Sequence, residues 1–343
     1  LDLFAGIGSF GLECISRGSK FVFFLENYPP VLEILKVNIS NLKYENKSKI
    51  IETDAFRIDT IRHVPHAFWR EASDRIREQN PDFFMFGEAF DYEANNIAQH
   101  TLPKNGGVSV LDFPMQKAMV SVFEKPLESD FADLETVLHL THGPYNNPYE
   151  LTTFYDNHDM ARINATDEGF INAHNWLFTV RGIPVVYMGS EIGFMRGTAE
   201  HAGNRNYVGQ ERLDQAKTHP IQQALTKIAN VRKNTVALQR GVQVNVELDG
   251  HQAAFYRVVD TAETQQTALV LLNKGNAAQS FEVSDFMQSG DWTEQLSGET
   301  QTVKLGDALT ATVKPNGVQV WVREGQVSNS ALLAQIKHQL ARQ

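Results

Sequence analysis

The chain has 343 residues, of which 42% are hydrophobic and 21% charged, the balance of a folded protein with room for two or three domains. Its net charge of −10 argues against a protein that mainly neutralises phosphates, so a nucleic acid is not the expected partner. The single cysteine, Cys14, excludes an internal disulfide, and no apolar run is long enough to span a bilayer.

The first 55 residues predict a βαβαβ unit, with strands at 1–4, 21–25 and 49–54 and helices at 12–17 and 31–42. The first turn carries Gly6-x-Gly8-x-x-Gly11, which permits close approach of a ligand to the helix N-terminus. Glu26 ends the second strand, where it could accept hydrogen bonds from ribose hydroxyls. This combination favours a nucleotide-type site over a plain glycine turn.

The chain begins inside a strand and shows no signal peptide, so we interpret its N-terminus as truncated and predict no compartment.

The amino-acid sequence of this unit resembles those of the SAM-dependent methyltransferases that modify a guanine of small-subunit ribosomal RNA. The resemblance is carried by Asp2-Leu3-Phe4-Ala5-Gly6, Gly11-Leu12-Glu13 and Ser16-Arg17-Gly18. It implies SAM as a ligand, with Gly6 and Gly8 near its methionine and ribose, Glu26 on the ribose and Asp54 near the adenine. That family's Asn-Pro-Pro-Tyr-type motif is absent, so SAM binding is an alternative function and methyl transfer is not favoured.

From residue 56 onward, apolar strands are expected to alternate with helices. The expected strands are 56–60, 83–88, 108–113, 152–156 and 183–188, and the expected helices include 67–79, 115–123 and 171–181. Three of these strands deliver an acid at or just beyond their C-terminal ends: Asp59, Glu88 and Asp159. This arrangement is typical of a parallel α/β barrel, whose active site lies at that face.

This part of the chain resembles glycoside hydrolase family 13, the α-amylase and glucanotransferase family. The matching runs are 56–63, Phe86-Gly87-Glu88, 154–159 with Arg162, and 182–191. The resemblance implies that Asp59 is the nucleophile, Glu88 the general acid/base and Asp159 the transition-state stabiliser. It also implies an α-glucan or maltooligosaccharide substrate and no cofactor for the chemistry. The implied substrate-binding residues are Arg57, Arg62, His63, His158 and Arg162.

The expected chemistry explains why these residue types are needed. Retaining glycoside hydrolysis uses two carboxyl groups about 5 Å apart, one as nucleophile and the other initially protonated. Apolar neighbours such as Phe86 and Phe90 are expected to raise the pKa of Glu88, because they disfavour its charged form. Arg57, two residues before Asp59, is expected to do the reverse. Each motif alone could be a structural ion pair or a loop, but the set favours an active site.

The first three strands of that family's barrel are missing before Phe56. The missing part normally ends in an Asp-x-x-x-Asn-His motif and supplies sugar contacts and a calcium ligand, so calcium is compatible with the family but no metal ligand is assigned here. Both resemblances share Asp54-Ala55-Phe56, so we interpret the chain as a chimera. Parallel neighbours need a long crossover, which predicts that 49–54 and 56–60 form one long or kinked strand in an imperfectly closed barrel. Impaired activity, or an inactive chimera, is therefore a further hypothesis.

After residue 240 the pattern changes to short alternating strands, which predicts an antiparallel sandwich. The strands are expected at 243–248, 253–259, 268–272, 280–283, 308–313 and 318–322. Trp292 and Trp321 could stack on sugars, but packing in the core or at a sheet edge is the favoured prediction. An amphipathic helix is expected at 331–342, and the polar stretch 195–211 is either a sugar-binding rim or a solvated loop.

The predicted fold class is α/β. A parallel barrel-like domain, incomplete or hybrid with the Rossmann-like N-terminal unit, is followed by an antiparallel β-sandwich. The predicted domains are 1–55, 56–240, 241–323 and a tail helix in 324–343. Hydrolysis and transglycosylation, linkage specificity and oligomeric state all stay open.

Overall fold

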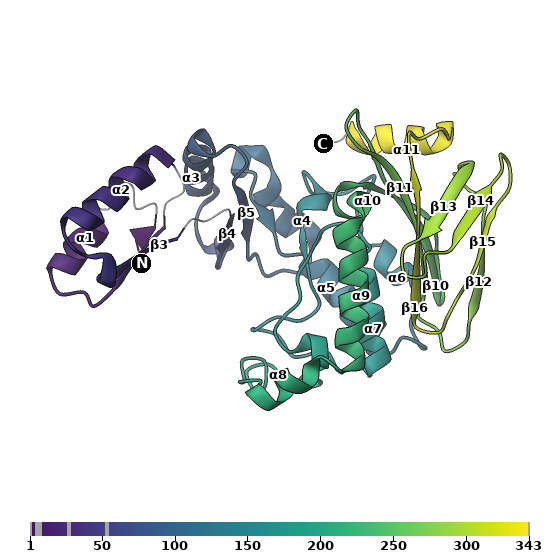
Figure 1. Ribbon diagram of the computed structural model, residues 1–343, viewed down its shortest axis with the longest axis horizontal. Helices are drawn as coiled ribbons and strands as arrows, with labels where there is room; N and C mark the ends of the chain where they lie inside the picture. The colour runs from purple at the N-terminus through teal and green to yellow at the C-terminus, as the bar shows by residue number, and fades with distance from the viewer. Residues whose placement is uncertain (1, 4–8, 26–28, 52–54, 342–343) are drawn as a thin grey trace. The chain divides into compact units, whose positions relative to one another are not determined.

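The computed structural model describes residues 2–3, 9–25, 29–51 and 55–341 (Figure 1). It divides into two compact units, which are described separately. One comprises Leu1–Glu88 with Pro103–Val108, and the other Ala89–Leu102 with Ser109–Gln343. No helix among the described residues is long and apolar enough to cross a membrane.

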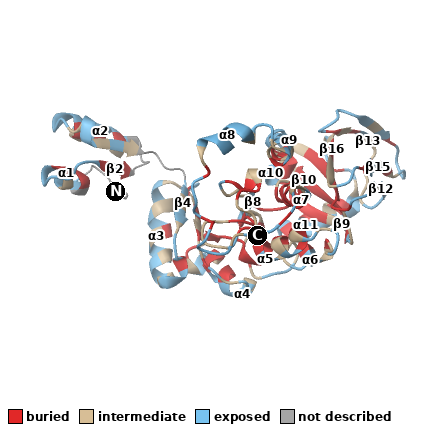
Figure 2. Cartoon of the chain, turned by 90° about the horizontal axis from the view of Figure 1, so that it is seen from below, coloured by how far each residue is buried: buried red, intermediate tan, exposed pale blue. Residues whose placement is uncertain are grey.

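The N-terminal βαβαβ unit forms as the sequence predicts. Its parallel strands β1 (Asp2–Leu3), β2 (Val22–Leu25) and β3 (Ser48–Ile51) are ordered β1-β2-β3, with β2 in the centre. The helices are α1 (Ser9–Ser16) and α2 (Pro29–Asn41), both of which show exposed outer surfaces in Figure 2. They bury a small apolar core made of Leu12, Ile15, Val22, Phe24, Leu35 and Ile39. The expected SAM-binding residues Gly6, Gly8, Glu26 and Asp54 lie outside the described residues.

A second parallel pair of strands follows in the same unit. β4 (Ala55–Ile58) pairs with β5 (Phe84–Gly87) from Ala55 opposite Phe84 to Ile58 opposite Gly87. They are connected through a short 3-10 turn (Ile61–His63) and α3 (His66–Gln79), a crossover that parallel neighbours require. β3 and β4 belong to different sheets, so the prediction of one long or kinked strand over 49–60 is wrong. Each segment finds its own partner strand, β2 and β5 respectively.

The barrel-like part of the second unit is built from very short parallel strands. They are β6 (Ser109–Val110), β7 (Thr152–Thr153) and β8 (Ile183–Pro184). β7 pairs in parallel with β8, and Leu111, just after β6, forms a parallel bridge to Thr152. The helices are α4 (Ala94–Ile97), α5 (Phe113–Glu124), α6 (Ala132–Glu135), α7 (Asp167–Leu177), α8 (Gln210–Ala216), α9 (Pro220–Asn234) and α10 (Val236–Arg240).

Helix α7 is displaced from the predicted range of 171–181. It starts at Asp167 because Thr166 caps it, the side chain accepting a hydrogen bond from the backbone N of Gly169 at 3.3 Å. Beyond its end, Arg181 is buried and forms a 2.5 Å ion pair with the buried Asp112, the N-cap of α5. The predicted helix end at Arg181 is therefore wrong, because α7 ends at Leu177 and Arg181 lies outside it.

The C-terminal module is an antiparallel β-sandwich, as predicted. Its six-stranded sheet has the order β14-β13-β16-β11-β10-β9, and β12 and β15 pair in a second sheet. The strands are β9 (Val242–Asp249), β10 (Gln252–Asp260), β11 (Gln265–Asn273), β12 (Gln279–Val283), β13 (Gly290–Glu294), β14 (Thr300–Val303), β15 (Leu309–Val313) and β16 (Gly317–Glu324). β13 and β14 were not predicted. Trp292 and Trp321 are fully buried in the core, which confirms their predicted role.

The final helix, α11 (Ser330–Leu340), packs onto this module. Asn329 caps it by accepting hydrogen bonds from the backbone N of Ala331 and of Leu332, both at 3.0 Å. Leu332 and Ile336 lie in the sandwich core. The structure confirms the predicted fold class, a barrel-like α/β domain followed by an antiparallel β-sandwich.

Candidate active site

Asp59 and Glu88 occupy equivalent positions at the C-terminal ends of two paired strands. The backbone ladder continues past the strands, because the N of Glu88 donates to the O of Ile58 at 2.8 Å and the N of Ile61 donates to the O of Glu88 at 3.1 Å. Neighbouring strands lie about 4.8 Å apart. The pairing therefore places the two acidic residues next to each other on neighbouring strands.

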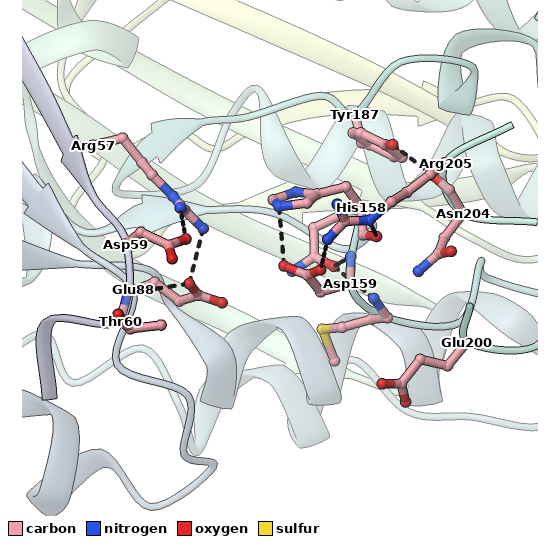
Figure 3. A network of polar contacts seen from close by, with 12 residues as sticks. Arg57, Asp59, Thr60, Glu88, His158, Asp159, Tyr187, Glu200, Asn204 and Arg205 are labelled. Atoms are coloured by element: carbon pink, nitrogen blue, oxygen red, sulfur yellow. Dashed lines mark hydrogen bonds and ion pairs between the residues drawn. The ribbon is translucent and has the colours of Figure 1, made fainter. Parts of the chain in front are cut away.

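Arg57 joins these two acids, as Figure 3 shows. Its Nη1 pairs with Asp59, and its Nη2 lies 2.9 Å from Oε2 of Glu88. The same Oε2 accepts a hydrogen bond from the backbone N of Thr60 at 3.4 Å. Both of these side-chain contacts engage Oε2 of Glu88.

The close approach of the turn after β4 to the end of β5 depends on Gly87. A Cβ at this position would lie 2.6 Å from Cδ1 of Ile61, closer than real contacts allow. Arg62 and His63, predicted to bind substrate, follow in the 3-10 turn with exposed side chains. They share the turn that follows the end of β4.

In the second unit, the run after β7 contains two aspartates in contrasting environments. Asp156 is buried and accepts hydrogen bonds from the backbone N of Ile163 at 2.8 Å and the hydroxyl of Ser190 at 2.9 Å. Burial raises the pKa of Asp156 above its ordinary value, opposed by those two hydrogen bonds. These contacts give Asp156 the role of holding the loop, which leaves the more accessible Asp159 as the candidate for chemistry.

Asp159 lies at the surface of its loop and is held by three neighbours (Figure 3). Its backbone N donates to Oδ1 of Asn157 at 2.9 Å, and its Oδ2 lies 3.0 Å from Nε2 of His158. Its Oδ1 pairs with Arg205, whose Nε also donates to the carbonyl of His158 at 3.1 Å. The loop turn, the imidazole and the arginine together fix the direction of this carboxylate.

Arg162, expected to bind substrate, is instead almost fully buried, with 2% of its surface exposed. Its Nη2 donates to the carbonyl of Met188 at 3.0 Å, and its Nε to that of Gly203 at 3.3 Å. The guanidinium also lies 4.8 Å from the ring centre of Tyr187. This placement favours anchoring the loop after β8 over direct contact with a sugar.

Sequence reasoning missed Arg205 and Asn157. Arg205 lies in the polar stretch 195–211, whose role the sequence left open between a sugar-binding rim and a solvated loop. Asn157 could have been found from the Asp-Asn-His-Asp spacing, because an asparagine two residues before a backbone N is a common turn-forming acceptor. No local signal pairs Arg205 with Asp159, since 46 residues separate them.

Among the described residues, no group of three or more His, Cys, Asp and Glu side chains could hold a metal ion. The described residues therefore do not fit a carboxylate-rich calcium site.

Together, the barrel-like fold and the acids at its strand ends define a class, the α/β-barrel enzymes that carry carboxylates at the C-terminal ends of their strands. A family profile described as the alpha amylase catalytic domain matches residues 37–253, more than half of the chain. The chain therefore belongs to the alpha-amylase catalytic-domain family.

Similar proteins with curated names include amylases and glucanotransferases. An alpha-amylase of Streptomyces lividans is 28% identical over 322 residues, covering 81% of this chain and 34% of the relative. A cyclomaltodextrin glucanotransferase of Geobacillus stearothermophilus is 25% identical over 307 residues, covering 84% of this chain and 41% of the relative. The chain thus spans well under half the length of these relatives.

Solved structures show the same fold. The alpha-amylase of Geobacillus thermoleovorans complexed with acarbose matches with a TM-score of 0.68 at 22% identity, covering 87% of this chain and 64% of that one. A cyclomaltodextrin glucanotransferase with a three-domain ABC distribution matches with a TM-score of 0.66 at 25% identity, covering 87% and 60%.

Proposed function

We propose that the chain acts on α-1,4-linked glucans or maltooligosaccharides as a retaining glycoside hydrolase or glucanotransferase. The single observation that supports this most is the strand-end pair of Asp59 and Glu88, joined by Arg57. The family membership and the printed activities of the amylase and glucanotransferase relatives support the substrate class.

In the proposed mechanism, Asp59 attacks the anomeric carbon while Glu88 gives a proton to the departing glycosidic oxygen. Arg57, which pairs with Asp59, holds the carboxylate of this nucleophile in place. In the second step Glu88 removes a proton from water or from an acceptor sugar hydroxyl, which then displaces Asp59 from the anomeric carbon. The choice between water and sugar decides between hydrolysis and transfer.

The remaining residues have supporting roles in this proposal. Asp159 stabilises the positive charge that develops on the sugar ring, as an anionic group held by its loop can. His158 and Arg205, which contact Asp159, position it. Arg62 and His63 contact the leaving-group side of the substrate, and Arg162 positions the loop after β8.

The test is mass spectrometry of the intact chain after incubation with an activated 2-deoxy-2-fluoro-glucoside. This probe should form a glycosyl adduct on Asp59, located by peptide mapping. Asp59→Asn should give no adduct, and the matched variant Asp82→Asn, an exposed acid before β5, should label like the wild type. Equal labelling of Asp59→Asn and wild type would contradict the assignment, and no labelling of a folded wild-type chain would contradict the function.

A second candidate function is SAM binding by the N-terminal unit. It is favoured by the parallel order β1-β2-β3, which matches the first half of a doubly wound nucleotide-binding fold. Under this proposal the chain is a chimera with boundaries at 1–55, 56–240, 241–323 and 324–343, and the hybrid barrel impairs glycoside hydrolysis. Calorimetry with SAM at micromolar concentration tests the binding, and Glu26→Ala should abolish any heat signal.

A further inference from the structure

A polar cavity of about 340 Å³ lies in the second unit, and no acid of the candidate site lines it. It is bordered by the segment after α6, by β9 and by α11, and its wall includes Thr136, His139, Asn245, Phe286, Gln335 and Gln339. Its volume falls in the range of small-molecule sites, about 300–1,000 Å³. No role in the proposed reaction involves these residues.

The polar wall of this cavity is fixed from behind by a chain of hydrogen bonds. The backbone N of Arg181 donates to Oε1 of the buried Gln243 at 2.9 Å, and Nε2 of Gln243 donates to Oδ1 of Asn245 at 2.9 Å. Nδ2 of Asn245 then donates to Oε1 of Glu135 at 3.0 Å. The amide of Asn245 is thereby oriented, and its second N–H and second lone pair remain for a ligand.

A second amide of the wall is fixed in the same way. Gln339 is buried, its Nε2 donates to the carbonyl of Gln243 at 2.7 Å, and its Oε1 accepts from the hydroxyl of Tyr149 at 2.8 Å. Preorganised groups lose little entropy when a ligand binds. This wall therefore resembles a binding surface more than a solvent-filled gap between elements.

Two residues of the wall adopt left-handed backbone conformations that non-glycine residues rarely use. They are His139, with φ +54°, and Phe286, with φ +57°. The ring of His139 packs 5.4 Å from that of Tyr145, and a Cβ at Gly143 would lie 2.6 Å from the Cβ of His139. Phe286 lies 6.4 Å from the ring of Tyr256. The surrounding structure thus holds both residues in backbone conformations that cost free energy.

The chemistry of the wall selects the class of ligand. It contains one carboxylate, Glu135, and neither lysine nor arginine, so it offers an anionic ligand no permanent positive charge. Amides, hydroxyls and imidazoles supply both donors and acceptors, and Phe286 adds an aromatic ring. Such a mixture fits a neutral polyhydroxylated ring, whose hydroxyls form hydrogen bonds while its C–H surface packs on the aromatic side chain.

We infer that this cavity binds one or two glucose rings of an α-glucan, as a second site apart from the site of cleavage. The assignment of the glucan rests on the proposed function, whereas the preference for a neutral sugar rests on the cavity itself. An enzyme that binds a glucan at a second site raises the effective concentration of that glucan at the site of cleavage.

The experiment is a titration of the full chain carrying Glu88→Gln with maltose, followed by NMR of the imidazole resonances of His139 and His142. Single His→Gln variants assign these two resonances among the 11 histidines. Both should shift saturably at millimolar maltose. Asn245→Leu and the exposed Gln335→Ala should each weaken binding about fivefold, the effect of one lost hydrogen bond of ~1 kcal/mol.

Lys337→Ala is the matched control, because Lys337 lies on the same helix α11, is exposed and does not border the cavity. It should leave the maltose affinity unchanged. Absence of a saturable shift, or one affinity shared by all variants, would overturn the inference. An equal response to the β-linked disaccharide cellobiose would overturn the assignment to α-glucan. If Asp59 is labelled covalently but the imidazole resonances do not shift, only the inference about this cavity is refuted. If neither the labelling nor the shifts occur, the proposed function is refuted as well.

Discussion

Two regions of the molecule present acids after short parallel strands, and they hold those acids in different ways. At β4 and β5, Asp59 and Glu88 share Arg57, and the parallel pairing of the two strands brings the acids next to each other. After β7, Asp156 is buried with both oxygens engaged by its own unit, while Asp159 is accessible on a turn. The same sequence pattern therefore produces a pair of acids joined by an arginine in one region, and one structural acid beside one candidate for chemistry in the other.

This difference teaches that the partners of a carboxylate, not its place after a strand, decide its role. An acid whose oxygens accept hydrogen bonds from a backbone N and a serine hydroxyl stabilises its loop. An acid that shares an arginine with a second acid can change its contacts when a substrate arrives. Four changes test this comparison, in order of decreasing expected effect.

The largest effect is expected at Glu88, in the first region. Glu88→Gln removes the proton donor, so kcat/KM for maltooligosaccharides should fall about 10²–10⁴-fold. A glucosyl fluoride, whose leaving group needs no proton, should lose far less. Steady-state kinetics with both substrates measure the contrast, and equal losses for the two would refute the role of Glu88 as general acid.

The second effect concerns Asp156, in the other region. Asp156→Ala leaves the backbone N of Ile163 and the hydroxyl of Ser190 without their acceptor, so the free energy of unfolding should fall by about 2–3 kcal/mol. Asp156→Asn keeps an acceptor oxygen and should cost less. Urea unfolding of both variants measures this, and a stable Asp156→Ala chain would mean that the acid does not hold its loop.

The third effect is pH-dependent and involves His174, which is fully buried next to Tyr155, with 2.7 Å between Nε2 and the tyrosine hydroxyl. Burial lowers the pKa of His174 from 6.5 to about 3. Between these values the unfolded chain binds a proton that the folded chain does not, so stability is present above pH 6.5 and is lost as pH falls towards 3.

A lowered pKa of this kind corresponds to about 1.4 kcal/mol per pH unit, or roughly 2 kcal/mol between pH 6.5 and 5. His174→Gln should remove this slope while leaving the rest of the pH dependence in place. Urea unfolding at several pH values compares the slopes of the two chains. Parallel curves for wild type and variant would show that His174 is protonated in the folded state.

The smallest effect is expected at Arg205, which pairs with Asp159 at the surface of its loop. Because this side chain is 63% exposed, Arg205→Ala should lower the free energy of unfolding by less than about 1 kcal/mol, and less in high salt. Lys217→Ala, an exposed cation after α8, is the control. A loss well above that of the control would mean that Arg205 supports the loop as strongly as Arg162 does.

Much of the fold could be predicted from local patterns. The apolar runs and glycine turns of the first 51 residues predicted a parallel βαβαβ unit, and alternation after residue 240 predicted the sandwich. β13 and β14 were missed because Trp292 is the only large apolar side chain in β13 and β14 is a run of threonine and glutamine ending in Val303. These strands form because they extend a sheet edge, where a neighbouring strand supplies the pairing.

By itself, the sequence determined which residues are candidates for chemistry, since motif spacing names Asp59, Glu88 and Asp159 directly. Tertiary structure alone decided that Arg57 joins two acids, that Arg162 is buried beneath the loop after β8, and that Arg205 pairs with Asp159. The physical reason is that hydrogen bonding and burial depend on neighbours brought together by folding, and 31 and 46 residues separate the partners of the Arg57–Glu88 and Arg205–Asp159 pairs. Local patterns fix strands and turns, but only the packed chain fixes which charges meet.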